Sequence, residues 1–159
     1  CGDDAIWVLR AYGSPYDDCR LKNLAISANV SWNALSGVGI KMEGFPGPGT
    51  ETDATRGTSI YGNVAMRNND PGIGIYSPEY TPYSNGDRVR HITVFANVAS
   101  DDQGDDATQD KGVSVNVRST DYDAIQNCCV VGNVVNGNSG DQIFIDATTD
   151  NDVSHNPGY

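Results

Sequence analysis

The sequence predicts an all-β fold, a parallel β-helix (solenoid) in which the chain coils repeatedly and each coil stacks on the last. Short apolar segments with period-two alternation recur along the chain, and an asparagine recurs at the same place in each of them. Glycine is frequent, at 18 of 159 residues, and no long amphipathic helix pattern appears. A long period shared by several strand-like segments is typical of stacked repeats.

The first repeated feature is an asparagine that follows a short strand-like segment, as in the stretch GTSIYGNV that ends at Val64. The recurring residues are Asn29, Asn63, Asn97, Asn133 and Asn156, at intervals of 34, 34, 36 and 23. Three positions before the five asparagines stand Ile26, Ile60, Val94, Val130 and Val153. One position after each of the first four asparagines stands a valine, namely Val30, Val64, Val98 and Val134. Five positions before the same four asparagines stand Leu24, Thr58, Ile92 and Cys128. We expect these flanking positions to face inward.

A second column of alternating residues shares the same long period. Its pairs are Ile6 with Val8, Val38 with Ile40, Ile73 with Ile75, Val113 with Val115, and Ile143 with Ile145. Two strand columns with one period indicate a coil whose equivalent residues lie about 4.8 Å apart from turn to turn. The asparagines then form a ladder at one corner, because the side-chain amide satisfies backbone groups at a bend and tolerates left-handed dihedral angles.

The repeat organises residues 1–159 as a single domain of about five rungs. Pro-rich, Gly-rich or acidic insertions are expected near 43–57, 77–88, 101–110 and 118–126. The chain begins without Met in strand-like sequence, so we expect it to be part of a longer β-helix. Strand edges at both ends of such a stack need cover, from flanking segments or from other subunits.

Charge and cysteine content narrow the classes of partner. The net charge of −11 and a pI near 4.2 disfavour nucleic acid and an anionic membrane surface as partners, and no apolar run reaches the roughly 20 residues of a membrane helix. No CxxC pair exists, so a zinc ribbon is unexpected. A disulfide between Cys1 and Cys19 is one possibility. Cys128 and Cys129 are adjacent, so at most one of them faces a core.

The opening segment CGDDAIWV carries the most specific motif. Its GDD resembles that of the pectate-lyase-like superfamily, especially polygalacturonase-type glycoside hydrolases, and SGVGIKMEG resembles the next rung of that family. The resemblance implies a right-handed β-helix in which Asp3 and Asp4 are catalytic carboxylates, one protonating the glycosidic oxygen and another activating water. Val38 stands where the family has histidine, and neither Lys41 nor Arg67 matches its basic pair well. The alternative is that the two aspartates cap a turn.

Alignment of the repeats gathers acidic residues along one edge of the stack, namely Asp3, Asp4, Asp70, Asp110 and Asp141. Asp3, Asp4 and Asp70 are therefore the candidate catalytic residues. The edge is an active cleft, a calcium edge or a solvated acidic rim, and these alternatives remain open. The loop DDQGDDATQD, residues 101–110, is acidic enough for Ca²⁺, although a solvated loop is favoured; no other cofactor is expected.

The outward positions between the inward pairs of the second column are Trp7, Gly39, Gly74, Ser114 and Phe144, and the same strands continue into Lys41, Tyr76, Asn116 and Asp146. This mixture of flat aromatic and hydrogen-bonding side chains is typical of a sugar groove. The candidate substrate-binding residues are Trp7, Lys41, Tyr76, Asn116 and Phe144. Packing against another subunit is the alternative use of the same surface.

These features together predict a module that binds a polysaccharide, with cleavage of that polysaccharide as a candidate activity, and the family resemblance implies a place at the cell exterior or on a virion. Phage tailspikes and secreted depolymerases have similar rungs, and that resemblance implies a homotrimer. A neutral glycan is the easier ligand, unless Arg88, Arg90 and Arg118 form a basic patch. The alternative is a non-catalytic structural or receptor-binding shaft of a fibrous or viral protein.

Overall fold

A computed structural model of the chain describes residues 4–9, 21–43, 53–77, 88–117, 125–145, 148–149 and 151–157. Within these ranges the regular structure consists of β-strands and one 3₁₀ turn, η1 (Gly104–Asp106). The prediction of an all-β fold is confirmed. No helix in the described ranges is long and apolar enough to cross a membrane.

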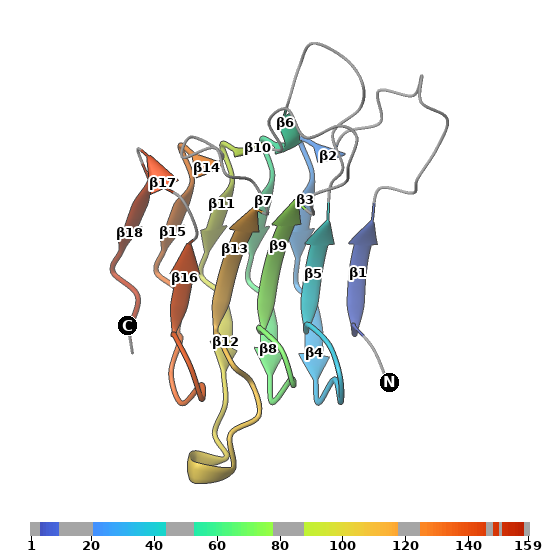
Figure 1. Ribbon diagram of the computed structural model, residues 1–159, viewed down its shortest axis with the longest axis vertical. Helices are drawn as coiled ribbons and strands as arrows, with labels where there is room; N and C mark the ends of the chain where they lie inside the picture. The colour runs from blue at the N-terminus through green and yellow to red at the C-terminus, as the bar shows by residue number, and fades with distance from the viewer. Residues whose placement is uncertain are drawn as a thin grey trace.

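The strands form four sheets, and Figure 1 shows the strands of sheet A side by side at the front with those of sheet C behind them. Sheet A contains β1 (Ile6–Leu9), β5 (Ile40–Glu43), β9 (Ile73–Ser77), β13 (Val113–Val117) and β16 (Ile143–Ile145). Sheet B contains β2 (Leu21–Lys22), β6 (Asp53–Arg56), β10 (Arg88–Arg90), β14 (Ile125–Gln126) and β17 (Thr148–Thr149). Sheet C contains β3 (Ala25–Ser27), β7 (Ser59–Tyr61), β11 (Thr93–Phe95), β15 (Cys129–Val131) and β18 (Asp152–Ser154). Sheet D contains β4 (Val30–Trp32), β8 (Val64–Met66) and β12 (Val98–Ser100).

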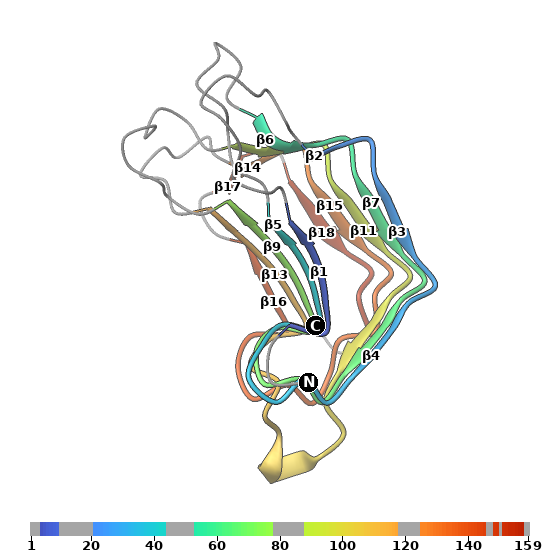
Figure 2. The same ribbon diagram turned by 90° about the vertical axis from the view of Figure 1, so that its right-hand side faces the viewer.

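The chain visits the sheets in the order A, B, C and D, and each strand pairs in parallel with its counterpart one repeat away. After β15 an isolated bridge between Val98 and Val134 stands in place of a sheet D strand. Figure 2 shows sheets A and C on opposite sides of a shared interior. These two sheets are the two predicted columns. Sheets B and D were not predicted, and β6 and β14 occupy parts of the expected insertions near 43–57 and 118–126.

The asparagine ladder is confirmed. The side chains of Asn63, Asn97 and Asn133 are at most 1% exposed, and each Nδ2 donates to Oδ1 of the next asparagine at 2.8–3.0 Å. The residue before each asparagine has a positive φ of 53–65°, in the order Ala28, Gly62, Ala96, Gly132 and His155. A left-handed residue turns the backbone sharply, and the asparagine side chain satisfies the groups that the turn leaves open.

One inward prediction is wrong at this corner. The valines that follow the asparagines face outward, and Val30 is 70% exposed while Val134 is 38% exposed. The inward positions come one residue later and are occupied by Ser31, Ala65, Ala99 and Val135. The left-handed residue reverses the alternation, so the parity counted before the corner does not continue after it. The column three residues before the asparagine is inward as predicted for Ile26, Ile60, Val94 and Val130.

The predicted register of sheet A is wrong in one repeat. Ile6 pairs with Ile40 instead of Val38, and Val8 pairs with Met42. Val38 is buried before the strand begins, where its N–H donates to Oδ1 of Asp4 at 2.8 Å. Because a shift of two residues keeps the same face inward, the apolar pattern could not reveal it. Lys41 therefore stands beside Trp7, in the place expected for Gly39.

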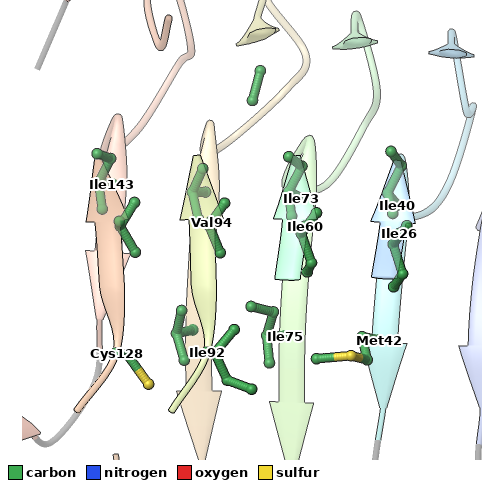
Figure 3. Close-up of a cluster of buried hydrophobic side chains, with 14 of the residues drawn as sticks. Ile26, Ile40, Met42, Ile60, Ile73, Ile75, Ile92, Val94, Cys128 and Ile143 are labelled. Carbon is green, nitrogen blue, oxygen red and sulfur yellow. The ribbon is translucent and has the colours of Figure 1, made fainter. Parts of the chain in front are cut away.

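The core lies between sheets A and C. Figure 3 shows Ile26, Ile60 and Val94 in succession along sheet C, facing Ile40 and Ile73 of sheet A. All five side chains are at most 6% exposed. Burying each such aliphatic side chain contributes roughly 2 kcal/mol, so the repeated column is the main stabilising element.

The loop at 101–110 is exposed over residues 102–106, as expected of a solvated segment, but Asp101 and Gln109 near its two ends are buried. Asp101 is 2% exposed, and its carboxylate accepts hydrogen bonds from the backbone N–H of Gln103, Thr108 and Gln109 at 3.0 Å each. The Gln109 side chain, 0% exposed, lies between Asn68 and Asn138 in a second amide chain, at 3.1 and 2.6 Å. The loop is thus anchored by its own carboxylate and by the interior.

Candidate functional site

The outer face of sheet A carries an aromatic residue beside charged groups. Register places Trp7 next to Lys41, whose Nζ lies 4.7 Å from the centroid of the Trp7 ring. The Trp7 Nε1–H donates to Oε2 of Glu43 at 3.1 Å, which fixes the ring against the sheet. Trp7 remains 47% exposed. The Trp7 ring is therefore fixed in position and exposed to solvent on the outer face of sheet A.

The lysine joins two carboxylates. Its Nζ lies 3.2 Å from Oδ2 of Asp4 and 3.3 Å from Oε2 of Glu43. Burial opposes the charge of Lys41, but the hydrogen bonds and charges of Asp4 and Glu43 outweigh it, so the pKa of Lys41 is raised. The Asp4 side chain is only 6% exposed and also accepts from the N–H of Val38. The group is an ammonium ion held between carboxylates.

Tyr76 continues this surface across the next strand. Its ring lies over Gly74, where a Cβ would collide with the ring edge, so glycine is required for this packing. A side-chain hydrogen bond links Tyr76 to the buried Ser114, and burial raises the pKa of the Tyr76 phenol, which therefore stays neutral. Lys41 Nζ lies 5.8 Å from the Tyr76 centroid. Asn116 neighbours Tyr76 in register on the next strand.

Asp70 lies just before β9 of sheet A, and Asp110 lies just before the following strand, β13. Burial first, and then the charges of Asp110 and Asp4, raise the pKa of the Asp70 carboxyl. One oxygen of Asp110 pairs with Lys111, and the other, Oδ1, is buried without a hydrogen-bond partner. Lys111 Nζ in turn lies 5.6 Å from the Phe144 ring centroid. The acidic edge is thus interleaved with two lysines.

Most of the predicted site residues lie together. Trp7, Lys41 and Tyr76 contact one another through the Lys41 ammonium, and Phe144 stands further along the same face beside Ser114. Asp4 and Asp70 interact electrostatically near them. Asp3 and Asp146 lie outside the described residues, as do Cys1, Cys19 and Arg118, and Asp141 is exposed.

The sequence interpretation missed Glu43 and Lys111. Glu43 could have been found, because strand alternation from Lys41 puts it on the same outward face. Lys111 could not have been found, because its proximity to Phe144 depends on side-chain direction.

The other metal and acid–base candidates are weaker. Among the described residues no group of three or more His, Cys, Asp or Glu side chains is arranged to hold a metal ion. His91 and His155 are both exposed corner residues with φ of 53°, and the two do not belong to the sheet A face. Cys128 is buried and Cys129 half-buried, as predicted for adjacent residues on a strand.

The arrangement combines an exposed aromatic plane, a second ring, hydrogen-bonding groups and a carboxyl with a raised pKa. Aromatic planes pack against the apolar faces of pyranose rings, and carboxylates and amides accept or donate to hydroxyl groups. A raised pKa favours the protonated form of a carboxyl, which is the form that acts in general acid catalysis. No family model, curated protein or solved structure matches the chain.

Proposed function

We propose that the chain is a segment of a right-handed parallel β-helix that binds a polysaccharide on the outer face of sheet A and cleaves it there. Support for the β-helix comes from the constant order of the four sheets and the in-register columns of Figure 2. Support for the function comes chiefly from exposed Trp7, held by Lys41 and Glu43 beside two acidic residues.

The ligand is a neutral glycan. One sugar ring packs on Trp7, the next lies toward Tyr76 and Asn116, and Phe144 marks the far end of the same face. Carboxylates at Asp4, Glu43 and Asp110 repel an anionic polymer, and the net charge of −11 acts in the same direction. Hydroxyl groups of a neutral sugar instead accept and donate hydrogen bonds at this rim.

Asp70 serves as the general acid. Burial and the charges of Asp110 and Asp4 raise the pKa of Asp70 and so favour its protonated form, and in this role Asp70 donates its proton to the glycosidic oxygen as the bond to the anomeric carbon breaks. An ionised aspartate of the pair Asp3 and Asp4 removes a proton from water as the water attacks the anomeric carbon. Lys41 Nζ lies 3.2 Å from Oδ2 of Asp4. The resemblance of the GDD segment supports this assignment of the pair.

The test is release of reducing ends from a panel of neutral polysaccharides, comparing the chain with Asp70→Asn and with the exposed control Asp105→Asn. Loss of a general acid lowers the rate by roughly 10²–10⁴-fold, and we expect that loss for Asp70→Asn alone. Equal rates for both variants contradict the assignment to Asp70. Binding is measured in parallel by affinity electrophoresis, where Trp7→Ala is expected to weaken retardation and Trp32→Ala is not.

The non-catalytic shaft is the second candidate function. Its support is the buried Val38 at the position of the family histidine, and the engagement of Asp4 by both Lys41 and the Val38 N–H. In that case the same polysaccharides bind through Trp7 without release of reducing ends. Either function places the chain at the cell exterior or on a virion, with flanking segments or further copies covering its strand edges.

A further inference from the structure

Asp70 and Asp110 occupy the same position in two neighbouring repeats. Their strands, β9 and β13, lie side by side in sheet A (Figure 1), and Ile73 pairs in register with Val113. Each aspartate stands three residues before its member of that pair. Equivalent residues of neighbouring parallel strands lie about 4.8 Å apart. The two carboxyl groups therefore start from adjacent places in one column.

Glycines stand on both sides of this pair of aspartates. The Asp70 N–H donates to the carbonyl of Gly37 at 3.2 Å, and the Gly140 N–H donates to the carbonyl of Asp110 at 2.7 Å. These backbone bonds place the two glycines one repeat away on either side of the pair. Because glycine has no side chain, the only side chain next to Asp70 in this column is that of Asp110, and the same holds in reverse.

One oxygen of the Asp110 carboxyl lacks a hydrogen-bond donor. Its Oδ2 pairs with the Lys111 ammonium, whereas its Oδ1 is buried, and no group in the described part of the chain donates to it. A buried polar atom without a partner is costly and uncommon, so this oxygen calls for an explanation. A protonated carboxyl has one O–H to donate, and Asp70 stands next in the column.

The surroundings of Asp70 favour the protonated form that such a bond needs. The charged and titratable groups that interact with Asp70 come from four strands of sheet A or from the residues just before them, and they are Asp4, Lys41, Tyr76, Asp110 and Lys111. Burial raises the pKa of Asp70 most, and among the charges that of Asp110 raises it most. The two lysines lower this pKa, but burial and the carboxylates outweigh them. Tyr76 adds no charge, because burial raises the pKa of its phenol and keeps it neutral.

We propose that Asp110 is a positioning residue for the general acid, with Oδ1 of Asp110 accepting the O–H of Asp70 until a glycosidic oxygen takes that proton. The inference rests on the proposed cleavage at Asp70. As the bond to the anomeric carbon breaks, the proton moves from Asp70 to the leaving oxygen, and Asp70 becomes a carboxylate beside Asp110. Repulsion between the two carboxylates then favours uptake of a proton from solvent, which restores the acid. The base returns to solvent the proton that it took from water, so the cycle balances.

A carbon-13 NMR titration of the carboxyl groups tests the pairing without any ligand, on the full chain labelled at aspartate. The Asp70 signal is identified by its loss in Asp70→Asn. We expect its titration midpoint to fall by roughly one pH unit or more in Asp110→Asn, and to stay unchanged in the exposed control Asp105→Asn. A midpoint that is unmoved or higher in Asp110→Asn overturns the proposal. If that variant fails to fold, as judged by far-ultraviolet circular dichroism, Asp110→Ser repeats the comparison.

The pH dependence of reducing-end release is the second readout, and a merely structural role for Asp110 would not move it. The fall in rate at high pH reports loss of the proton from the general acid, so Asp110→Asn should shift that fall to lower pH by the amount seen in the NMR midpoint. Cleavage whose pH dependence and midpoint are both unmoved overturns the role of Asp110 alone. A lowered midpoint in a chain that cleaves none of the polysaccharides overturns the proposed cleavage, and the positioning role with it.

Discussion

The corner of each repeat is set by two residues, a left-handed residue and the asparagine after it. Gly62 and Gly132 signal this conformation in the sequence, but Ala28 and Ala96 adopt it too, at a cost of about 1 kcal/mol each. An alanine in the sequence does not indicate a positive φ. The asparagine column could therefore be predicted from sequence, whereas the outward direction of Val30 and Val98 could not.

Asn97 tests the ladder. Its Nδ2 donates to the carbonyl of Ile60 and to Oδ1 of Asn133, and its Oδ1 accepts from the backbone and side chain of Asn63. Asn97→Ala leaves buried partners unsatisfied, so we expect a loss of about 3 kcal/mol in the free energy of unfolding by urea. Asn29 lies at the end of the ladder, and Asn29→Ala should cost roughly 1 kcal/mol. Equal costs would contradict the ladder.

Asp70 makes the stability of the fold depend on pH. Its raised pKa means that the folded chain binds the proton more tightly than the unfolded chain, so this group stabilises the fold at low pH and the stability is lost as pH rises through the folded pKa. Asp70→Asn removes that loss. Measured by thermal unfolding, the variant should gain stability relative to the unaltered chain as pH rises from about 3 to about 7. A relative decline over that range contradicts the cause we assign to the shift.

At the scale of elements, the register of β5 shows what an apolar pattern can and cannot specify. The pattern in residues 38–42 fits two registers that differ by two residues, and both bury one apolar face. Local polar contacts and the space between neighbouring strands select one of the two registers. A Cβ on Gly39 would lie 2.6 Å from the carbonyl oxygen of Gly72, and one on Gly72 would lie 3.1 Å from that of Gly112. The glycines therefore mark the close turn before each strand.

Gln109 tests whether the acidic loop is part of the interior. Its amide bridges Asn68 and Asn138, and its backbone N–H donates to Asp101. Gln109→Ala should lower the free energy of unfolding by about 2–4 kcal/mol, because it leaves a cavity and unpaired amides. Gln103→Ala, at an exposed position in the same loop, should change it by less than about 0.5 kcal/mol. Similar small effects for both would show that the loop is merely attached to the surface.

For the whole molecule, Cys128 reports on opening of the core. Burial raises the pKa of its thiol to about 11, so almost none of it is thiolate at a pH of about 8. In a Cys129→Ser variant we expect iodoacetamide to modify Cys128 only as the circular dichroism of the sheets is lost in urea. Mass spectrometry of the modified peptide measures this. Modification well before the unfolding transition would mean that this part of the core opens independently.

The arrangement of the whole molecule was partly accessible from sequence. The long period predicted parallel stacking, and the outward alternation predicted that Trp7 and Tyr76 share a face. Sheet B escaped prediction because β6 and β14 lie inside segments that were expected to be insertions, and sheet D because its strands follow the corner, where the alternation reverses.

The most direct test of glycan binding uses the two tryptophans of the chain. In a Trp32→Phe variant Trp7 is the only tryptophan, and in a Trp7→Phe variant only Trp32 remains. Each is titrated with the neutral polysaccharide that the unaltered chain retains in affinity electrophoresis. Saturable change in the emission of Trp7, with none from Trp32, is the predicted result. Saturation reported by Trp32 alone, or by neither residue, would contradict binding on the outer face of sheet A.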